Sequence, residues 1–115
     1  FFFSVITPSQ PCTSTLRFLL HNDVREEFLN NLVAKYGKLR IGDPLDSKTV
    51  MGPLVDDGAI EAYEHAIDQV KKSGGEILVK GKRLDQKGSF VSPTIAAVPG
   101  NLDIVKEETF APCST

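Results

Sequence analysis

The chain has 115 residues, 41% of them apolar, which is one domain's worth with a modest core. Its formal charge of −2, without a Lys/Arg cluster or an apolar run near the ~20 residues of a membrane span, argues against nucleic-acid and membrane partners. Its two cysteines are too few for the disulfide framework of a secreted protein, so we expect a reducing compartment, namely the cytoplasm, with the mitochondrial matrix left open.

The first part of the chain predicts a short strand followed by a helix. Residues 16–21 form a mainly apolar run between turn-type residues, which is typical of a buried strand. Asp23 can cap a helix, and Glu26 follows it at the spacing of a capping box. Apolar residues at helical spacing then predict an amphipathic helix over residues 23–36, ended by Gly37. Its core-facing residues would be Val24, Phe28, Leu29, Leu32, Val33 and Tyr36.

A loop and a second helix are predicted next. Gly42-Asp-Pro44 and Gly52-Pro53 punctuate the loop, because each proline keeps its predecessor out of helical geometry. The helix should begin near Asp56 and Asp57, whose charges suit the positive end of the helix dipole. Gly74-Gly75 should end it. Its buried face would be Ala59, Ile60, Tyr63, Ala66, Ile67 and Val70.

Three extended segments are expected in the last third of the chain. Glu76–Lys80 predicts a strand, and Phe90–Val98 predicts a second one in which Pro93 requires an edge or an irregular position. Residues 102–105 should form a short extended piece that precedes the acidic pair of residues 107–108. Strands that alternate with helices favour an α/β fold with a mostly parallel sheet and flanking helices.

One cysteine is a candidate nucleophile. Cys12 lies in the turn-rich run of residues 7–17, where a partly exposed sulfur near backbone N–H groups would favour the thiolate. On residue type alone, an inert apolar cysteine remains the alternative. His21 and His65 stand apart, and no Cys/His spacing suits zinc, so no metal site is expected. Cys113 is assigned no role.

Four segments in order carry a resemblance to a known family. Residues 10–17, 41–46, 51–54 and 106–112 resemble the cysteine segment, two proline turns and the Glu-Glu-x-Phe-Gly-Pro loop of the aldehyde dehydrogenase superfamily. Alanine before Pro112 is most similar to the antiquitin branch, the α-aminoadipic semialdehyde dehydrogenases. The resemblance divides the chain into a divergent segment (1–9), a partial catalytic domain (10–112) and a divergent tail (113–115). This division is what we expect of a fragment of a family member.

The resemblance implies oxidation of a small-molecule aldehyde to a carboxylic acid through a thiohemiacetal and a thioester on Cys12. It also implies that Glu108 accepts hydrogen bonds from the hydroxyls of the nicotinamide ribose and that Phe110 packs beside the nicotinamide. The cofactor would be NAD, with NADP left open. Without the resemblance, Glu108 would be a solvated charge and Phe110 a core aromatic. Full-length family members are expected to be homo-oligomers.

The resemblance also predicts that the isolated chain is inactive. The family's general-base glutamate, its asparagine oxyanion donor and most of its cofactor contacts come from sequence upstream of the cysteine. Ser9 replaces a glycine of the family pattern, and Pro11 removes a backbone N–H beside the thiol. Two alternatives remain: a non-catalytic fragment that associates with full-length subunits, and an unrelated thiol hydrolase that uses Cys12.

Overall fold

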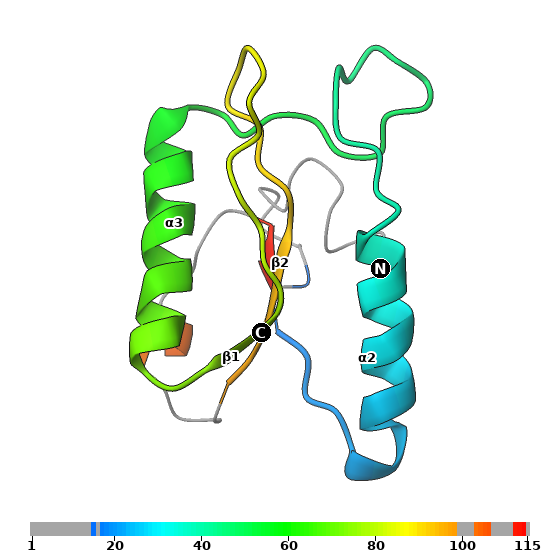
Figure 1. The fold of residues 1–115 in the computed structure, drawn as a ribbon, viewed down its shortest axis with the longest axis vertical. Helices are drawn as coiled ribbons and strands as arrows, with labels where there is room; N and C mark the ends of the chain where they lie inside the picture. The colour runs from blue at the N-terminus through cyan, green and yellow to red at the C-terminus, as the bar shows by residue number, and fades with distance from the viewer. Residues whose placement is uncertain (1–14, 16, 99–102, 107–111, 115) are drawn as a thin grey trace.

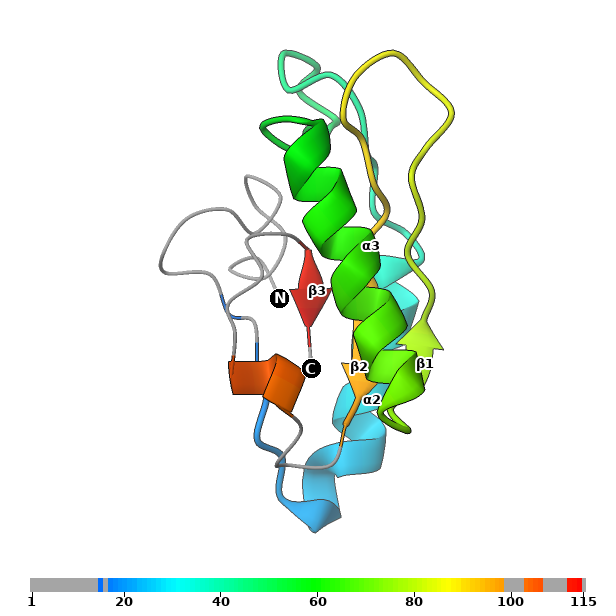
Figure 2. The ribbon, with the colours of Figure 1, turned by 90° about the vertical axis from the view of Figure 1, so that its left-hand side faces the viewer.

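The computed structural model describes residue 15 and residues 17–98, 103–106 and 112–114. Within them a small sheet lies between two helices, α2 (Asn22–Tyr36) and α3 (Asp57–Lys72). The helices cover opposite faces of the sheet, as the two perpendicular views show (Figures 1 and 2). The predicted α/β class with flanking helices is therefore confirmed.

The sheet has the strand order β1 (Glu76–Val79), β2 (Thr94–Ala97), β3 (Cys113–Ser114). In the described residues it is mixed rather than mostly parallel, because β1 pairs antiparallel with β2, and β2 pairs parallel with β3. No helix connects β1 to β2. The chain turns back as a long hairpin, closed by a bridge between Arg83 and Val91, and a hairpin makes its strands antiparallel.

Helix α3 follows the sequence prediction closely. The Asp56 carboxylate caps it by accepting a 2.8 Å hydrogen bond from the backbone N–H of Ala59. After its last residue, Gly74 adopts a φ of 81°, the left-handed conformation that commonly follows a helix. Three of the five buried residues of α3 pack with Met51, Leu54 and Val91 into one core cluster; they are Ile60, Tyr63 and Ile67.

Helix α2 matches its predicted range but buries less of its surface than expected. Leu32 and Tyr36 are buried and form a second core cluster with Ile95 of β2. Val24 and Val33, which were predicted to face the core, remain 52% and 36% exposed. A narrow sheet offers too little surface to cover the full apolar stripe, so only the strip of α2 that faces the strands is buried.

Two predicted extended segments differ in the structure. Residues 17–21 form no strand with any part of the chain that the structure describes. A strand needs a hydrogen-bonding neighbour, which an apolar pattern cannot guarantee. Residues 102–105 were expected to be extended, but Asp103–Lys106 forms a short 3₁₀ helix, η2. Its ends are joined by a 2.6 Å ion pair between the Lys106 ammonium and the Asp103 carboxylate.

Candidate active site

The site residues predicted from the sequence all lie outside the described residues. Cys12 precedes the first of them, and Glu108 and Phe110 fall between Lys106 and Pro112. The acidic neighbour Glu107 lies in the same interval. The structure therefore neither brings these residues together nor separates them. It does describe the chain on the carboxyl side of both segments, where each joins the folded body.

The segment that follows Cys12 is attached through Phe18. The Phe18 ring packs against Phe28 of α2, with 5.3 Å between the ring centroids and a tilt of 55°. Such a tilted pair adds about 0.5–1.5 kcal/mol beyond its buried area. Phe18 also packs on the core cluster that contains Ile95 of β2. This packing joins the first described part of the chain to one face of the sheet.

The segment that follows Glu108 is attached through Pro112. The Pro112 carbonyl accepts a 2.8 Å hydrogen bond from the backbone N–H of Thr94, the first residue of β2. Pro112 is fully buried, and the next two residues form β3 beside β2 (Figure 2). Both the bond and the strand pairing hold the carboxyl end of this segment against the sheet.

The two attachments meet at consecutive residues of one strand. Thr94 binds Pro112, and Ile95 belongs to the cluster on which Phe18 packs. Neighbouring residues of a strand point to opposite faces of the sheet. Strand β2 is thus the common support of both segments that carry predicted site residues.

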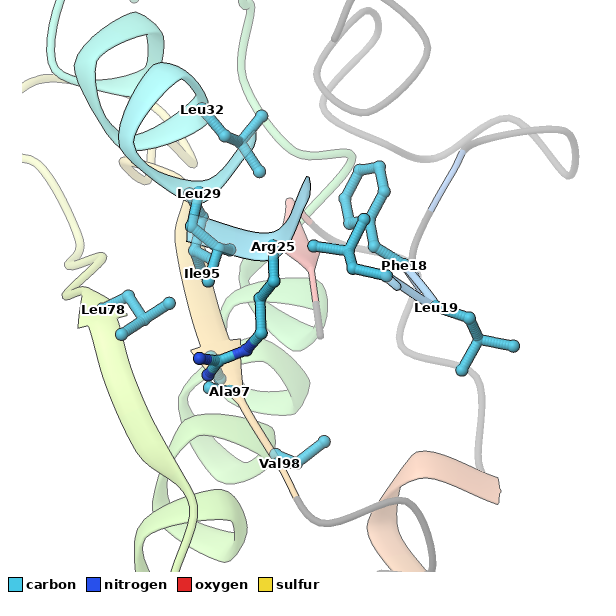
Figure 3. Close-up of a pocket in the computed structure, with 11 residues that line it drawn as sticks. Phe18, Leu19, Arg25, Leu29, Leu32, Leu78, Ile95, Ala97 and Val98 are labelled. Carbon is cyan, nitrogen blue, oxygen red and sulfur yellow. The ribbon is translucent and has the colours of Figure 1, made fainter. Parts of the chain in front are cut away.

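An apolar groove opens between the Phe18 segment, α2 and the sheet (Figure 3). It has a volume of about 210 Å³, and its walls include Leu29, Leu78 and Ile95. Arg25 of α2 extends across it with the guanidinium toward Ala97 (Figure 3). Among the described residues that line it, the groove has mainly apolar walls and the cation of Arg25, and such walls suit contact with another apolar surface.

The described ion pairs lie at the surface. Arg83 contacts Asp57 at 3.0 Å, and both side chains are more than half exposed, which makes such a pair worth about 0–1 kcal/mol. Within residues 15, 17–98, 103–106 and 112–114, no group of three His, Cys, Asp or Glu side chains is placed to hold a metal ion. In the same residues no helix combines the length and apolarity needed to cross a bilayer.

Sequence reasoning missed a buried polar cluster beside the Pro112 attachment. Tyr63 was predicted only to face the core, and Gly81 and Thr94 were given no role. In the structure the hydroxyls of Tyr63 and Thr94 lie 2.6 Å apart, and the backbone N–H of Gly81 binds the Thr94 hydroxyl. These contacts join residues far apart in sequence, so no local pattern indicates them.

Comparisons with known proteins agree with the resemblance. Residues 2–115 match the model of the Aldehyde dehydrogenase family. The chain is 39% identical to aldehyde dehydrogenase family 7 member A1 of Malus domestica, over 97% of this chain and 22% of that protein. It is 38% identical to α-aminoadipic semialdehyde dehydrogenase of Bos taurus, over 96% of this chain and 21% of that protein. The predicted branch is thereby confirmed.

Comparison with solved structures also finds aldehyde dehydrogenases. A crystal structure of betaine aldehyde dehydrogenase from Staphylococcus aureus in complex with NAD+ superposes with a TM-score of 0.91 at 29% identity. The superposition covers 97% of this chain and 23% of that one. The chain therefore spans about a fifth of the length of the relatives that it matches.

Proposed function

This chain belongs to the aldehyde dehydrogenase family, and from that membership we propose that it is a segment of an NAD(P)-dependent dehydrogenase that carries the nucleophilic cysteine. The observation that carries the proposal is the extent of the family match, because residues 2–115 include both Cys12 and Glu108. The relatives of the α-aminoadipic semialdehyde branch favour an aldehyde as substrate.

In the proposed reaction, the Cys12 thiolate attacks the aldehyde carbon and forms a thiohemiacetal. The Cys12 backbone N–H donates to the oxyanion that develops. Glu108 and Phe110 would hold NAD, which would supply the acceptor for the hydride of this carbon. The product on the sulfur is a thioester, and water cleaves it to release the carboxylic acid and restore the thiol. The hydride removes two electrons and one proton from the aldehyde carbon, and the water that breaks the C–S bond supplies the oxygen of the acid and the proton on the released sulfur.

The chemistry of Glu108 and Phe110 fits a nicotinamide nucleotide. The Glu108 carboxylate is an acceptor-only group, which matches the two hydroxyl donors of a ribose. The ring of Phe110 offers an apolar surface for the nicotinamide end. The close superposition on a dehydrogenase that holds NAD+ supports the same cofactor class.

We propose that the isolated chain does not turn over. In the resembled family the general base and the second oxyanion donor come from residues upstream of the cysteine, and the present sequence holds about a fifth of a full-length relative. Its function in isolation would then be limited to the reactivity of the thiol and to partial cofactor binding.

The test uses the purified chain, aldehydes and NAD. We expect no NADH formation, and we expect iodoacetamide near neutral pH to modify Cys12 at least about tenfold faster than Cys113, as a thiolate-favouring loop would require. Cys12→Ser and Cys113→Ser identify the two sites by mass spectrometry. NADH formation would contradict the proposed incompetence, and equal labelling would contradict the nucleophile. Ester hydrolysis lost in Cys12→Ser would favour the thiol hydrolase instead.

The apolar groove favours a second candidate, a non-catalytic piece that associates with full-length subunits. Leu19 lies at the groove and is 92% exposed, and Phe18, Leu29 and Leu78 extend the same apolar surface. A contiguous apolar surface that is exposed to solvent often marks a site of contact with another protein.

A further inference from the structure

A chain of buried hydrogen bonds ends at the first residue of β2. Thr94 is 0% exposed, and its hydroxyl accepts a 3.0 Å hydrogen bond from the backbone N–H of Gly81. The Tyr63 hydroxyl donates a 2.6 Å bond to the Ser92 carbonyl and lies 2.6 Å from the Thr94 hydroxyl. Since a phenol has one proton, the Thr94 hydroxyl must donate to the Tyr63 oxygen. The bonds therefore run in one direction from Gly81 through Thr94 and Tyr63 to Ser92.

This chain of bonds leaves no room for adjustment. A Cβ atom on Gly81 would overlap the Tyr63 hydroxyl, the Ser92 carbonyl and the Thr94 hydroxyl. Among the described residues, no buried side-chain nitrogen or oxygen lacks a partner. A fully satisfied polar cluster in a buried place fixes one geometry, because any displacement breaks a bond that water cannot replace.

The backbone of Thr94 carries the next link. Its N–H donates to the Pro112 carbonyl at 2.8 Å, and its Cα pairs with Cys113 in the parallel ladder. The side chain of Thr94 is thus held by Tyr63, while its main chain holds Pro112. Thr94 therefore links Tyr63 of α3 to Pro112, the last residue before β3.

We propose that Tyr63 is a positioning residue, whose hydroxyl acts through Thr94 to fix the carboxyl end of the segment that carries Glu108 and Phe110. The inference rests on the proposed function, since this segment matters as a cofactor-binding loop only there. Hydrophobic packing does not require the hydroxyl, because a phenylalanine ring would fill the same space in α3. The Tyr63 hydroxyl therefore contributes through its hydrogen bonds, which orient Thr94.

The test measures cleavage of the full 115-residue chain by a glutamate-specific protease, without NAD. The readout is the cleavage rate after Glu107 and Glu108 divided by the rate after Glu26 and Glu27 of α2. Local release raises this ratio, whereas a general loss of stability accelerates both sites together. Hydrogen exchange of the Thr94 amide gives a second, independent reading of the bond to Pro112.

Two variants remove a hydroxyl from the cluster and two serve as controls. We expect Tyr63→Phe and Thr94→Val to raise the ratio about tenfold. Each change would weaken the attachment of Pro112 to Thr94 and so make local release of the segment before Pro112 more frequent. Thr94→Ser keeps the hydroxyl and should stay within about twofold of the unaltered chain. Ile67→Val, which trims the buried face of α3 and removes no hydroxyl, should do the same.

An unchanged ratio in Tyr63→Phe, or an equal acceleration at all four glutamates, would overturn the inference. If Tyr63→Phe did not fold, Thr94→Val compared with Thr94→Ser would decide in the same way. Because the assay contains no NAD, its outcome is separate from the proposed function. If the chain shows these ratios but a full-length relative that carries residues 10–112 of this chain keeps its dehydrogenase activity after Cys12→Ser, the proposed function is contradicted and the positioning role is left intact.

Discussion

The backbone N–H of Thr94 donates to the Pro112 carbonyl at 2.8 Å, which joins the start of β2 to the residue just before β3. This bond lies directly after the segment that contains Glu108 and Phe110. The side chain of the neighbouring Ile95 packs on the α2 side of the sheet, in the cluster that receives Phe18. Both segments with predicted site residues are therefore supported by the same short strand.

The close approach of Tyr63, Ser92 and Thr94 to Gly81 leads to a prediction about stability. Gly81→Ala places a methyl group onto the Tyr63 hydroxyl and breaks the buried cluster, so we expect it to lower the free energy of unfolding by about 3 kcal/mol or more. Gly74→Ala is the matched control, because Gly74 has open space around it and only its φ of 81° to disfavour a side chain. It should cost about 1 kcal/mol.

Urea unfolding followed by circular dichroism measures both variants, with the slope of the free energy against urea checked for constancy. If both variants lost the same free energy of unfolding, the contacts around Gly81 would adjust easily, which would contradict the tight packing of Gly81 on Tyr63 and Thr94.

Helix α3 shows how much the sequence predicts when the determinants are local. The cap at Asp56, the apolar spacing and the glycine pair all act within one segment, and the helix and its buried face appear as expected. The segment of residues 17–21 shows the opposite case. Its apolar pattern predicts a strand, but strand formation depends on a neighbour that a local pattern does not contain, and Leu19 is 92% exposed.

The candidate site also contains residues that local motifs predict and contacts that they do not. Cys12, Glu108 and Phe110 were predicted from motifs, and they stay predictions because they lie outside the described residues. The contacts of Tyr63, Gly81 and Thr94 had no motif to indicate them. They arise when a helix, a turn and a strand meet in space, and only the fold brings them together.

The apolar groove predicts where the chain would bind a full-length subunit. Leu19→Lys should weaken co-purification with a full-length relative at least about tenfold, since it places a charge on an apolar contact. Leu45→Lys is the control, because Leu45 is 93% exposed in the loop between the helices and does not line the groove. Equal binding by both variants would contradict the association. Neither change should affect folding, as both side chains are solvent-exposed.

The proposed role of Glu108 can be measured in a chimera, a full-length relative in which residues 10–112 of this chain replace the matching segment. Glu108→Gln weakens acceptance from the ribose hydroxyls, and the loss of a charged hydrogen bond worth about 1.5 kcal/mol raises the KM for NAD about tenfold. Glu107→Gln, its neighbour and matched control, should change that KM less than twofold. Similar effects from both glutamates would contradict the specific assignment.

The measurement that tests the central claim most directly is aldehyde-dependent NADH formation by this chimera with and without Cys12. We predict that the chimera is active and that Cys12→Ser lowers kcat by at least about a thousandfold, as removal of a covalent nucleophile does. A folded chimera whose activity survives Cys12→Ser would contradict the claim that this chain carries the nucleophile of an aldehyde dehydrogenase.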